Sequence, residues 1–420
     1  MDGSPLDIDR LRADTIGCAS GLIHLNNAGA ALVTHRVADA VTDHLALEAV
    51  CGGYEAAELA DGRSDAFYDA AATIVGGRRD EIAFTDSATR AWLSVFQALD
   101  WQEGDEVITA SSEYSSHLIT FRLAEMRQGV VTRIAPDTAS GVVDPEGLEA
   151  LITSRTRLIC ISHMPTNDGL LNPVEEIGKI AARHGVPFLL DACQSVGQVP
   201  MDVASLNCTM LSATGRKYLR GPRGTGFLWV RSDWIDRLTP AALDIRSARL
   251  LDVRHFEISG TARRFELWER YQAGQIGLGV ACEYAVQIGL PAIWERIRNL
   301  AGYLRNELSE VPGISVFDRG AAQSGIVTFG HEALESKEII TRLRQEKRIN
   351  TSLSATQLTR TELISRGVHQ MVRASVHVYN TIDELDQLVA ALRELSEPRG
   401  RRTGRAQGRR KDGQETTQPR

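Results

Sequence analysis

Lysine is scarce in this sequence. Only five of its 47 basic residues are lysines, at positions 179, 217, 337, 347 and 411, and arginine supplies the rest. Lysine can lose its proton and act as a nucleophile or a base, which arginine cannot do. Lys217 is the first candidate for chemistry, because it lies among glycines and arginines in SATGRKYLRGPRGTGFLWV (residues 212–230).

Cysteine pairs and long apolar runs are also missing. The six cysteines form no Cys-x-x-Cys pair, and no histidine cluster has the spacing of zinc ligands. These spacings indicate neither a disulfide framework nor a metal site. No stretch approaches the roughly 20 apolar residues that cross a bilayer, and the N-terminus is acidic and polar, unlike a signal peptide. We therefore expect a cytoplasmic protein with reduced thiols, no bound metal and no membrane contact.

The negative charge of the chain is unevenly distributed. The net charge is −7, but residues 399–420 carry eight basic and two acidic groups, which leaves −13 on residues 1–398. An acidic body argues against nucleic acid as the main partner, since phosphates attract a basic face. The tail lacks aromatic residues and an apolar period, so we predict a disordered extension over residues 397–420, with a contact to RNA or another polyanion as the alternative.

Short apolar runs alternate with helical patterns between about residues 80 and 230. The runs read as strands at 105–110, 157–162, 186–191, 208–213 and 225–230, and residues 116–128 and 173–185 have helical spacing. This alternation predicts an α/β fold with a mostly parallel sheet covered on both faces. Beyond residue 275 the pattern predicts one long helix continuing to about residue 310. A strand at 324–330, a helix at 336–347, a strand at 371–380 and a final helix at 382–396 follow, as in a smaller α+β domain.

Polar residues at two places in the sequence suggest a cofactor. Asp191 directly follows the apolar run VPFLL, so its carboxylate is expected half-buried at the end of a strand, where it needs a cationic partner. Ser87 and Thr89 lie at the start of an expected helix, where free N–H groups favour a phosphate. An aspartate for a pyridinium N–H, a phosphate site and a reactive lysine together suit pyridoxal 5′-phosphate (PLP).

At this point the sequence resembles a known family. FLLDACQSVGQ followed by SATGRKYLRGPRGTGFL is similar to the cofactor motif of the class V aminotransferases. These are PLP enzymes of fold type I that include cysteine desulfurases, C–S lyases and isopenicillin N epimerase. The resemblance runs from IHLNNAGA near residue 23 to VRASVHVYNTIDELDQLV, which ends at residue 389. It implies an N-terminal segment (1–30), a large PLP-binding domain with a seven-stranded sheet (31–276) and a small C-terminal α+β domain (277–396).

The resemblance also implies roles for individual residues. Lys217 would bind the cofactor and move the Cα proton, and Asp191 would pair with the ring nitrogen. Tyr114 would stack on the ring as a third catalytic residue. The cofactor-binding set is Ser87, Ala88, Thr89, Tyr114, Asp191, Gln194, Thr214, Arg216 and Lys217, and the substrate-binding set is Arg373, Asn27, Thr166 and Asn167. His117 and His163 are more typical of structural positions and receive no role.

The sequence departs from the family pattern at two places. Cysteine desulfurases carry a mobile cysteine on a loop of the small domain, but INTSLSATQLTRTELISRG has only serines and threonines, and the last cysteine is Cys282. Trp268 and Glu269 stand where relatives often have a Gly-Thr pair that reaches the neighbouring subunit's phosphate. The missing cysteine argues against persulfide chemistry of that kind. The Trp268–Glu269 pair favours a substrate other than free cysteine.

We therefore expect a PLP-dependent C–S lyase that acts by β-elimination on a cysteine S-conjugate, rather than a persulfide-forming desulfurase. Aminotransferase, epimerase or decarboxylating deaminase chemistry on the same scaffold is the alternative, and a binding subunit without catalysis is a third. The partner is a small amino-acid substrate. The family also implies a homodimer with active sites at the interface, with RFELWERYQ (264–272) as the candidate crossing segment.

Overall fold

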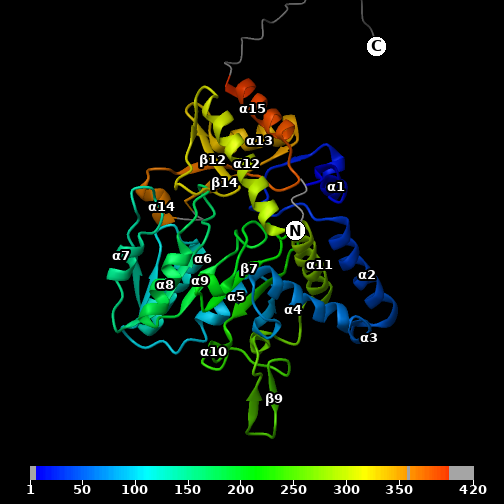
Figure 1. The fold of residues 1–420 in the computed structure, drawn as a ribbon, viewed down its shortest axis with the longest axis vertical. Helices are drawn as coiled ribbons and strands as arrows, with labels where there is room; N and C mark the ends of the chain where they lie inside the picture. Colours follow the sequence, from blue (N-terminus) through cyan, green and yellow to red (C-terminus); the bar gives the residue numbers. More distant parts are fainter. Residues whose placement is uncertain (1–5, 357–359, 397–420) are drawn as a thin grey trace, which may run out of the picture.

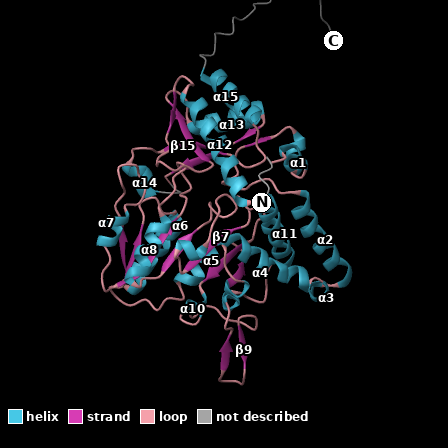
Figure 2. Cartoon of the chain, viewed as in Figure 1, coloured by secondary structure: helices cyan, strands magenta, loops and turns pink. Residues whose placement is uncertain are grey.

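The computed structural model describes residues 6–356 and 360–396. It contains a large sheet and a smaller sheet. The seven-stranded sheet and its helices fill the lower half of Figure 1, and a four-stranded sheet lies above it. The predicted disordered tail, 397–420, lies outside the described residues. Figure 2 shows helices on both sides of the large sheet.

The large sheet has the strand order β2-β8-β7-β6-β5-β3-β4. Its strands are β2 (Ile82–Thr85), β3 (Glu106–Thr109), β4 (Val131–Ile134), β5 (Thr156–Ser162), β6 (Phe188–Asp191), β7 (Met210–Thr214) and β8 (Gly226–Val230). Five neighbouring strands, β7, β6, β5, β3 and β4, are parallel to one another. Strand β8 runs antiparallel to both of its neighbours, β2 and β7. The prediction of a mostly parallel seven-stranded sheet is confirmed.

Apolar residues on both faces of each central strand hold the layers together. Leu189 and Met210 pack into one hydrophobic cluster, whereas the next residues, Leu190 and Leu211, pack into the other. Neighbouring residues of a strand point to opposite faces, so strands apolar at every position need a helix layer on each side. One layer contains α5 (Ala88–Phe96), α6 (Ser115–Gln128) and α10 (Ser232–Ile235), and the other contains α4 (Asp61–Val75), α8 (Val174–His184) and α9 (Val203–Leu206).

The carboxyl ends of the parallel strands bring polar residues together. Ser162, Asp191 and Thr214 are the last residues of β5, β6 and β7. The strand register pairs Ser162 with Asp191, and Asp191 with Ser212. This edge of the sheet is where ligands bind in folds of this class.

The small sheet is antiparallel, with the order β11-β12-β15-β14. Its strands are β11 (Ile314–Val316), β12 (Ile326–His331), β14 (Ser352–Ala355) and β15 (Gln370–Ser375), and it packs against α12 (Leu290–Ser309) and α13 (Ser336–Lys347), with α15 (Ile382–Ser396) beside these two helices. The N-terminal strand β1 (Ile23–His24) pairs in parallel with β13 (Ile349–Asn350). The remaining helices are α1 (Ile8–Ala13), α2 (His35–Cys51), α3 (Gly53–Leu59), α7 (Pro145–Ala150) and α14 (Arg360–Ser365). The division into domains stays a prediction.

The prediction of one long helix after residue 275 is wrong. α11 (Gln272–Ile288) ends at Gly289, and α12 leaves it at an angle of 80°. Gly289 has a φ of 93°, a conformation that favours glycine, and Pro291 in the first turn of α12 has no N–H to continue a helix. Among the described residues, no single helix is both long and apolar enough to cross a membrane; α11 and α12 together qualify only by length and composition.

A β-hairpin that the sequence did not reveal projects from the lower edge of the large domain (Figure 1). β9 (Ala248–Leu250) pairs antiparallel with β10 (Phe256–Ile258). Its apolar side chains are exposed, most of all Val253 at 94%.

Two helix glycines differ in the space around them. A Cβ at Gly178 in α8 would lie 1.9 Å from the Leu206 carbonyl oxygen, whereas a Cβ at Gly302 in α12 would meet nothing within 4 Å. We expect Gly178→Ala to lower the free energy of unfolding by about 1–3 kcal/mol, because α8 must move away from α9. Gly302→Ala, the matched control, should raise it by about 0.4–1 kcal/mol. Thermal and urea unfolding measure both effects, and equal behaviour of the two variants would contradict the packing.

Candidate functional site

A cavity of about 250 Å³ opens at the carboxyl edge of the large sheet. All nine residues of the predicted cofactor-binding set line it, namely Ser87, Ala88, Thr89, Tyr114, Asp191, Gln194, Thr214, Arg216 and Lys217. The wall also includes Thr166, one of the four predicted substrate-binding residues. The predicted cofactor-binding residues therefore lie together around one cavity, and their binding of a cofactor stays a prediction.

The N-terminus of α5 forms the end of the cavity where an anion can bind. Ser87 precedes the helix, its hydroxyl oxygen accepts from the Arg90 N–H (3.2 Å), and its hydroxyl donates to Asp86 (2.9 Å). Gly226 on β8 lets the backbone approach closely, since a Cβ there would lie 2.8 Å from the Ser87 carbonyl carbon and 2.9 Å from the Ala88 nitrogen. Free N–H groups and the helix dipole at this position favour a phosphate.

Asp191 presents a buried carboxylate to the cavity. Its Oδ1 accepts from the Cys193 N–H at 2.9 Å, and its Oδ2 lies 3.4 Å from the Ser162 hydroxyl and 3.9 Å from His117 Nε2. Burial raises the pKa of Asp191, while the charge of His117 opposes this rise. A cation on the cavity side, such as a protonated ring nitrogen, would stabilise the ionised form.

Lys217 follows β7 and points its amine at the same cavity. Its Nζ lies 3.3 Å from the Sγ of Cys193, which follows β6. Burial lowers the pKa of Lys217, and the positive charges of Arg216 and Arg373 lower it further. Cys193 and Asp191 raise this pKa but do not outweigh burial and the two arginines. A larger fraction of this amine is therefore neutral near pH 7 than in an ordinary lysine.

Gln194 leaves one polar atom without a partner. Its Nε2 donates to the Ala28 carbonyl oxygen at 3.2 Å, but its Oε1 is buried and has no hydrogen-bond partner among the described residues. Buried amide oxygens normally accept a hydrogen bond. A ligand hydroxyl in the cavity would satisfy this atom, which is consistent with a ring hydroxyl at this position.

Arg373 on β15 reaches the cavity wall through Thr166. Its Nη1 donates to the Thr166 carbonyl oxygen (3.0 Å) and to the Thr166 hydroxyl (2.6 Å), and its Nε donates to Ser352 (3.1 Å). Within the described residues, no hydrogen bond engages Nη2, so one donor remains for a carboxylate. Burial lowers the pKa of Arg373 to about 10, which leaves the side chain charged at neutral pH.

Three of the four predicted substrate-binding residues lie outside the cavity lining: Arg373, which contacts the wall residue Thr166, and the two asparagines. Asn27 is fully buried, where it donates to the Ser375 carbonyl oxygen at 2.7 Å and accepts from the Tyr379 hydroxyl. Asn167 is also fully buried and accepts from the hydroxyl of Ser354 on β14. Both connect segments around the cavity, and their direct contact with substrate stays a prediction.

Sequence reasoning missed three residues beside the cavity. His117 and Cys193 line the wall, and Glu113 lies directly behind His117. Glu113 precedes the expected helix 116–128 that contains His117, so helical spacing alone did not indicate their contact. Nothing in the sequence pattern indicates that Cys193 lies beside Lys217.

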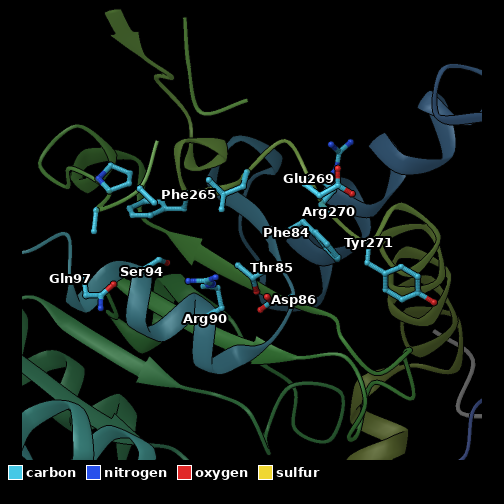
Figure 3. Close-up of a pocket in the computed structure, with 14 residues that line it drawn as sticks. Phe84, Thr85, Asp86, Arg90, Ser94, Gln97, Phe265, Glu269, Arg270 and Tyr271 are labelled. Atoms are coloured by element: carbon cyan, nitrogen blue, oxygen red, sulfur yellow. The ribbon is translucent and has the colours of Figure 1, made fainter. Parts of the chain in front are cut away.

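A second cavity, of about 190 Å³, lies on the other side of Asp86, which lines both cavities. Figure 3 shows Glu269, Arg270 and Tyr271 on one side of it and Arg90, Ser94 and Gln97 of α5 on the other. Glu269 is exposed and lines this second cavity rather than the one that holds Lys217.

Comparison with known proteins identifies the family. Residues 23–388 match the model of the family described as aminotransferase class V, so the chain belongs to the class V aminotransferases. A probable cysteine desulfurase of Methanothermobacter thermautotrophicus is 29% identical over 77% of this chain and 82% of its own length. The cysteine desulfurase of Haloferax volcanii is 25% identical over 93% of this chain and 97% of its own length.

Solved structures show the same fold. The apo cysteine desulfurase from Thermococcus onnurineus has a TM-score of 0.86 at 23% identity, covering 94% of this chain and 99% of its own. A cystine C–S lyase in complex with its product cysteine persulfide has a TM-score of 0.79 at 23% identity, covering 89% and 97%. Desulfurases and a C–S lyase thus share this architecture, and the likeness does not separate the two reactions.

The lowered pKa of Lys217 can be tested without any cofactor. We expect reductive methylation with formaldehyde at pH 6.5–7.5 to modify Lys217 at a lower pH than the exposed Lys337, because only the neutral amine reacts. Peptide mass spectrometry over a pH series measures this. If Lys217 is methylated only at the same pH as Lys337, or at a higher pH, the lowered pKa of Lys217 is contradicted.

Proposed function

We propose that the protein is a PLP-dependent lyase that cleaves the carbon–sulfur bond of a cysteine derivative by β-elimination. The class V family and the cavity residues support PLP as the cofactor. The N-terminus of α5, with Thr214 and Arg216, would hold the phosphate. Asp191 would face the ring nitrogen, Gln194 Oε1 the ring hydroxyl, and Tyr114 one face of the ring.

PLP, when bound, supplies a ring that accepts electron density from the carbon next to the substrate amine. The protein positions the substrate and moves protons. Arg373 holds the substrate carboxylate through its remaining Nη2 donor, which fixes the orientation of Cα in the cavity. Lys217, with its lowered pKa, takes the proton from Cα at its Nζ.

The elimination balances without a further reactant except water. The Cα–H electron pair forms the new Cα–Cβ double bond as the Cβ–S bond breaks, and the sulfur leaves with its electron pair as a thiolate. The released 2-aminoacrylate is hydrolysed by one water to pyruvate and ammonia. Lys217 gives up its proton to solvent or to the departing sulfur, which restores the neutral amine.

The positions of the cysteines favour β-elimination over desulfuration. All six lie within the described residues, and Cys193 alone lines the cavity. Cys282, the last in the sequence, is buried in α11, and the stretch from 348 to 367 contains none. A desulfurase of the usual kind needs a cysteine on that stretch to receive sulfur, so a thiol or persulfide that leaves with the product fits this chain better.

Cysteine desulfuration is the second candidate. The names of the relatives favour it, and the placement of Cys193 Sγ at 3.3 Å from Lys217 Nζ offers one thiol inside the cavity. In that reaction sulfur would pass from the substrate to Cys193 and alanine would be released. Aminotransfer, epimerisation and decarboxylating deamination remain alternatives that differ in their products.

Product analysis separates these reactions. Purified protein with PLP is mixed with cystine, cysteine S-conjugates and cysteine, and pyruvate, ammonia, thiol and alanine are measured. We expect pyruvate and ammonia in equal amounts from a disulfide or thioether substrate, and Lys217→Ala should lower the rate at least about 100-fold. Alanine together with a persulfide on the Cys193 peptide would contradict elimination, as would pyridoxamine 5′-phosphate, substrate epimer or carbon dioxide as the product.

The proposed assembly is a homodimer. Beyond the family resemblance, two exposed apolar groups support it: the hairpin β9–β10, and the region around Tyr54 and Trp268, whose rings are 6.5 Å apart and 74% and 45% exposed. The hairpin group is Leu250, Leu251, Val253 and Phe256. Trp268 of this second group belongs to the segment 264–272, which is the predicted crossing segment.

Charges on the hairpin should break this dimer. We expect the double substitution Val253→Asp and Phe256→Asp to raise the dimer dissociation constant by at least about 30-fold, because burying two carboxylates against apolar groups is costly. Sedimentation at several protein concentrations measures this. Met126→Asp, at an apolar side chain of α6 that is 71% exposed, serves as the control and should leave the dimer intact. A wild type that is monomeric throughout would contradict the proposal.

A further inference from the structure

A row of three ionisable side chains leads from the core to the cavity. His117 Nδ1 lies 2.8 Å from Glu113 Oε1, and His117 Nε2 lies 3.9 Å from Asp191 Oδ2. Glu113 is fully buried and His117 is 3% exposed, so water does not separate their charges. The order is carboxyl, imidazole, carboxyl; His117 and Asp191 line the cavity, and Glu113 lies behind them.

The hydrogen bonds around Glu113 define its charge. Its Oε1 faces the Tyr114 N–H (3.0 Å) and the Ser162 hydroxyl (2.5 Å) in addition to His117. Its Oε2 faces the Ser162 N–H (3.0 Å) and the Thr109 hydroxyl (3.3 Å). Two of these contacts come from backbone N–H groups, which can only donate, so the surroundings favour the carboxylate form of Glu113. In that form, His117 Nδ1 carries a hydrogen that it donates to Glu113.

The other ring nitrogen of His117 faces a second acceptor. If Nε2 carried no proton, its lone pair would face the oxygen Asp191 Oδ2, and the two would repel each other. If Nε2 is protonated, the imidazolium and the carboxylate attract each other. The hydroxyl of Ser162 donates its single proton to Glu113, at 2.5 Å. The same hydroxyl oxygen lies 3.4 Å from Asp191 Oδ2 and carries no charge. His117 is therefore the nearest group that can place positive charge beside Asp191 on the protein side.

Neighbouring groups hold the imidazole in this orientation. The ring of Trp92 stacks on it, with centroids 4.2 Å apart and planes 9° apart, and an aromatic face also favours a cation. The thiol of Cys160 accepts from Trp92 Nε1 at 3.1 Å, and burial raises its pKa well above the ordinary value, so it is neutral. Tyr114 meets the imidazole ring edge-on, at 6.0 Å between centroids.

We propose that His117 is a positioning residue that carries a proton, held by Glu113, and keeps Asp191 ionised toward the ring nitrogen of the cofactor. This inference rests on the proposed PLP function. With Glu113 and Asp191 negative and His117 positive, the row has one net negative charge, which a protonated ring nitrogen neutralises. Asp191 alone beside Glu113 would take up a proton more readily, since like charges repel in a buried site.

The pKa shifts agree with this arrangement. Burial lowers the pKa of His117, but the hydrogen bond and charge of Glu113 and the charge of Asp191 outweigh burial and raise it above its ordinary value. For Glu113, burial raises the pKa, and its donors lower it by more. The remaining charged neighbour of the row is Lys217, whose positive charge also favours the ionised form of Asp191.

A cofactor analogue isolates the contact at the ring nitrogen. Dissociation constants are measured for PLP and for its 1-deaza analogue, which has carbon in place of the ring nitrogen. We expect His117→Asn to reduce the preference for PLP over the analogue by about tenfold, the equivalent of one pKa unit, while affinity for the analogue changes little. His163→Asn is the matched control, because His163 is buried nearby and its Nδ1 has no hydrogen-bond partner among the described residues. An unchanged preference in His117→Asn would overturn the inference.

The charge of His117 is measured directly in the protein without added cofactor. Nitrogen-15 histidine spectra of the wild type, assigned by the signal lost in His117→Asn, should show an imidazolium that persists above pH 6.5. Glu113→Gln should move its titration to lower pH. Titration of His117 at or below pH 6.5 in the wild type would overturn the inference. Failure of the wild type to bind PLP would instead contradict the proposed function, and this titration would still decide the charge of His117.

Discussion

The carboxylate of Asp191 sits at the buried end of β6, and its negative charge imposes most of the arrangement around it. Removing a charge from water without partners costs several kcal/mol. The protein meets this cost with the Cys193 N–H and the imidazole of His117. Parallel strands supply the geometry, because their register places Ser162 beside Asp191 at one edge of the sheet. The cavity side remains for a cationic ring nitrogen.

The positive side of the site follows the same logic. Lys217 lies in one cavity wall with Arg216, and Arg373 reaches that wall through Thr166. Burial lowers the pKa of Lys217, and the positive charges of Arg216 and Arg373 lower it further. A phosphate and a substrate carboxylate are the anions that complement the two arginines and the N-terminus of α5. The scarcity of lysine in the chain thus agrees with the special position of this one.

Much of this arrangement could be predicted from the sequence. Continuous apolar runs predicted the buried parallel strands, and residues that directly follow such runs, Asp191 above all, had to lie at the sheet's carboxyl edge. The helix start at Ser87 was likewise predicted from local signals. The resemblance to the class V family supplied the cofactor and the roles, which no periodicity could give.

Other features depend on tertiary contacts that local patterns do not encode. The break at Gly289 was missed because the apolar period continues through it, while the left-handed backbone and Pro291 turn the chain. The β9–β10 hairpin has no strong strand signal, and its apolar residues are exposed rather than buried. His117 was given no role, because its importance comes from β6, which is far away in the sequence. Asn27 was predicted at the substrate, but its side chain is held in a buried network between the N-terminal segment and β15.

Trapping of the cofactor on the protein tests the central claim most directly. The purified protein is incubated with PLP, reduced with borohydride, digested and analysed by peptide mass spectrometry. The account predicts a pyridoxyl phosphate adduct on the peptide that contains Lys217, in near-stoichiometric amount, and its loss in Lys217→Ala. An unmodified Lys217 peptide, or an adduct spread over the exposed lysines, would contradict the account.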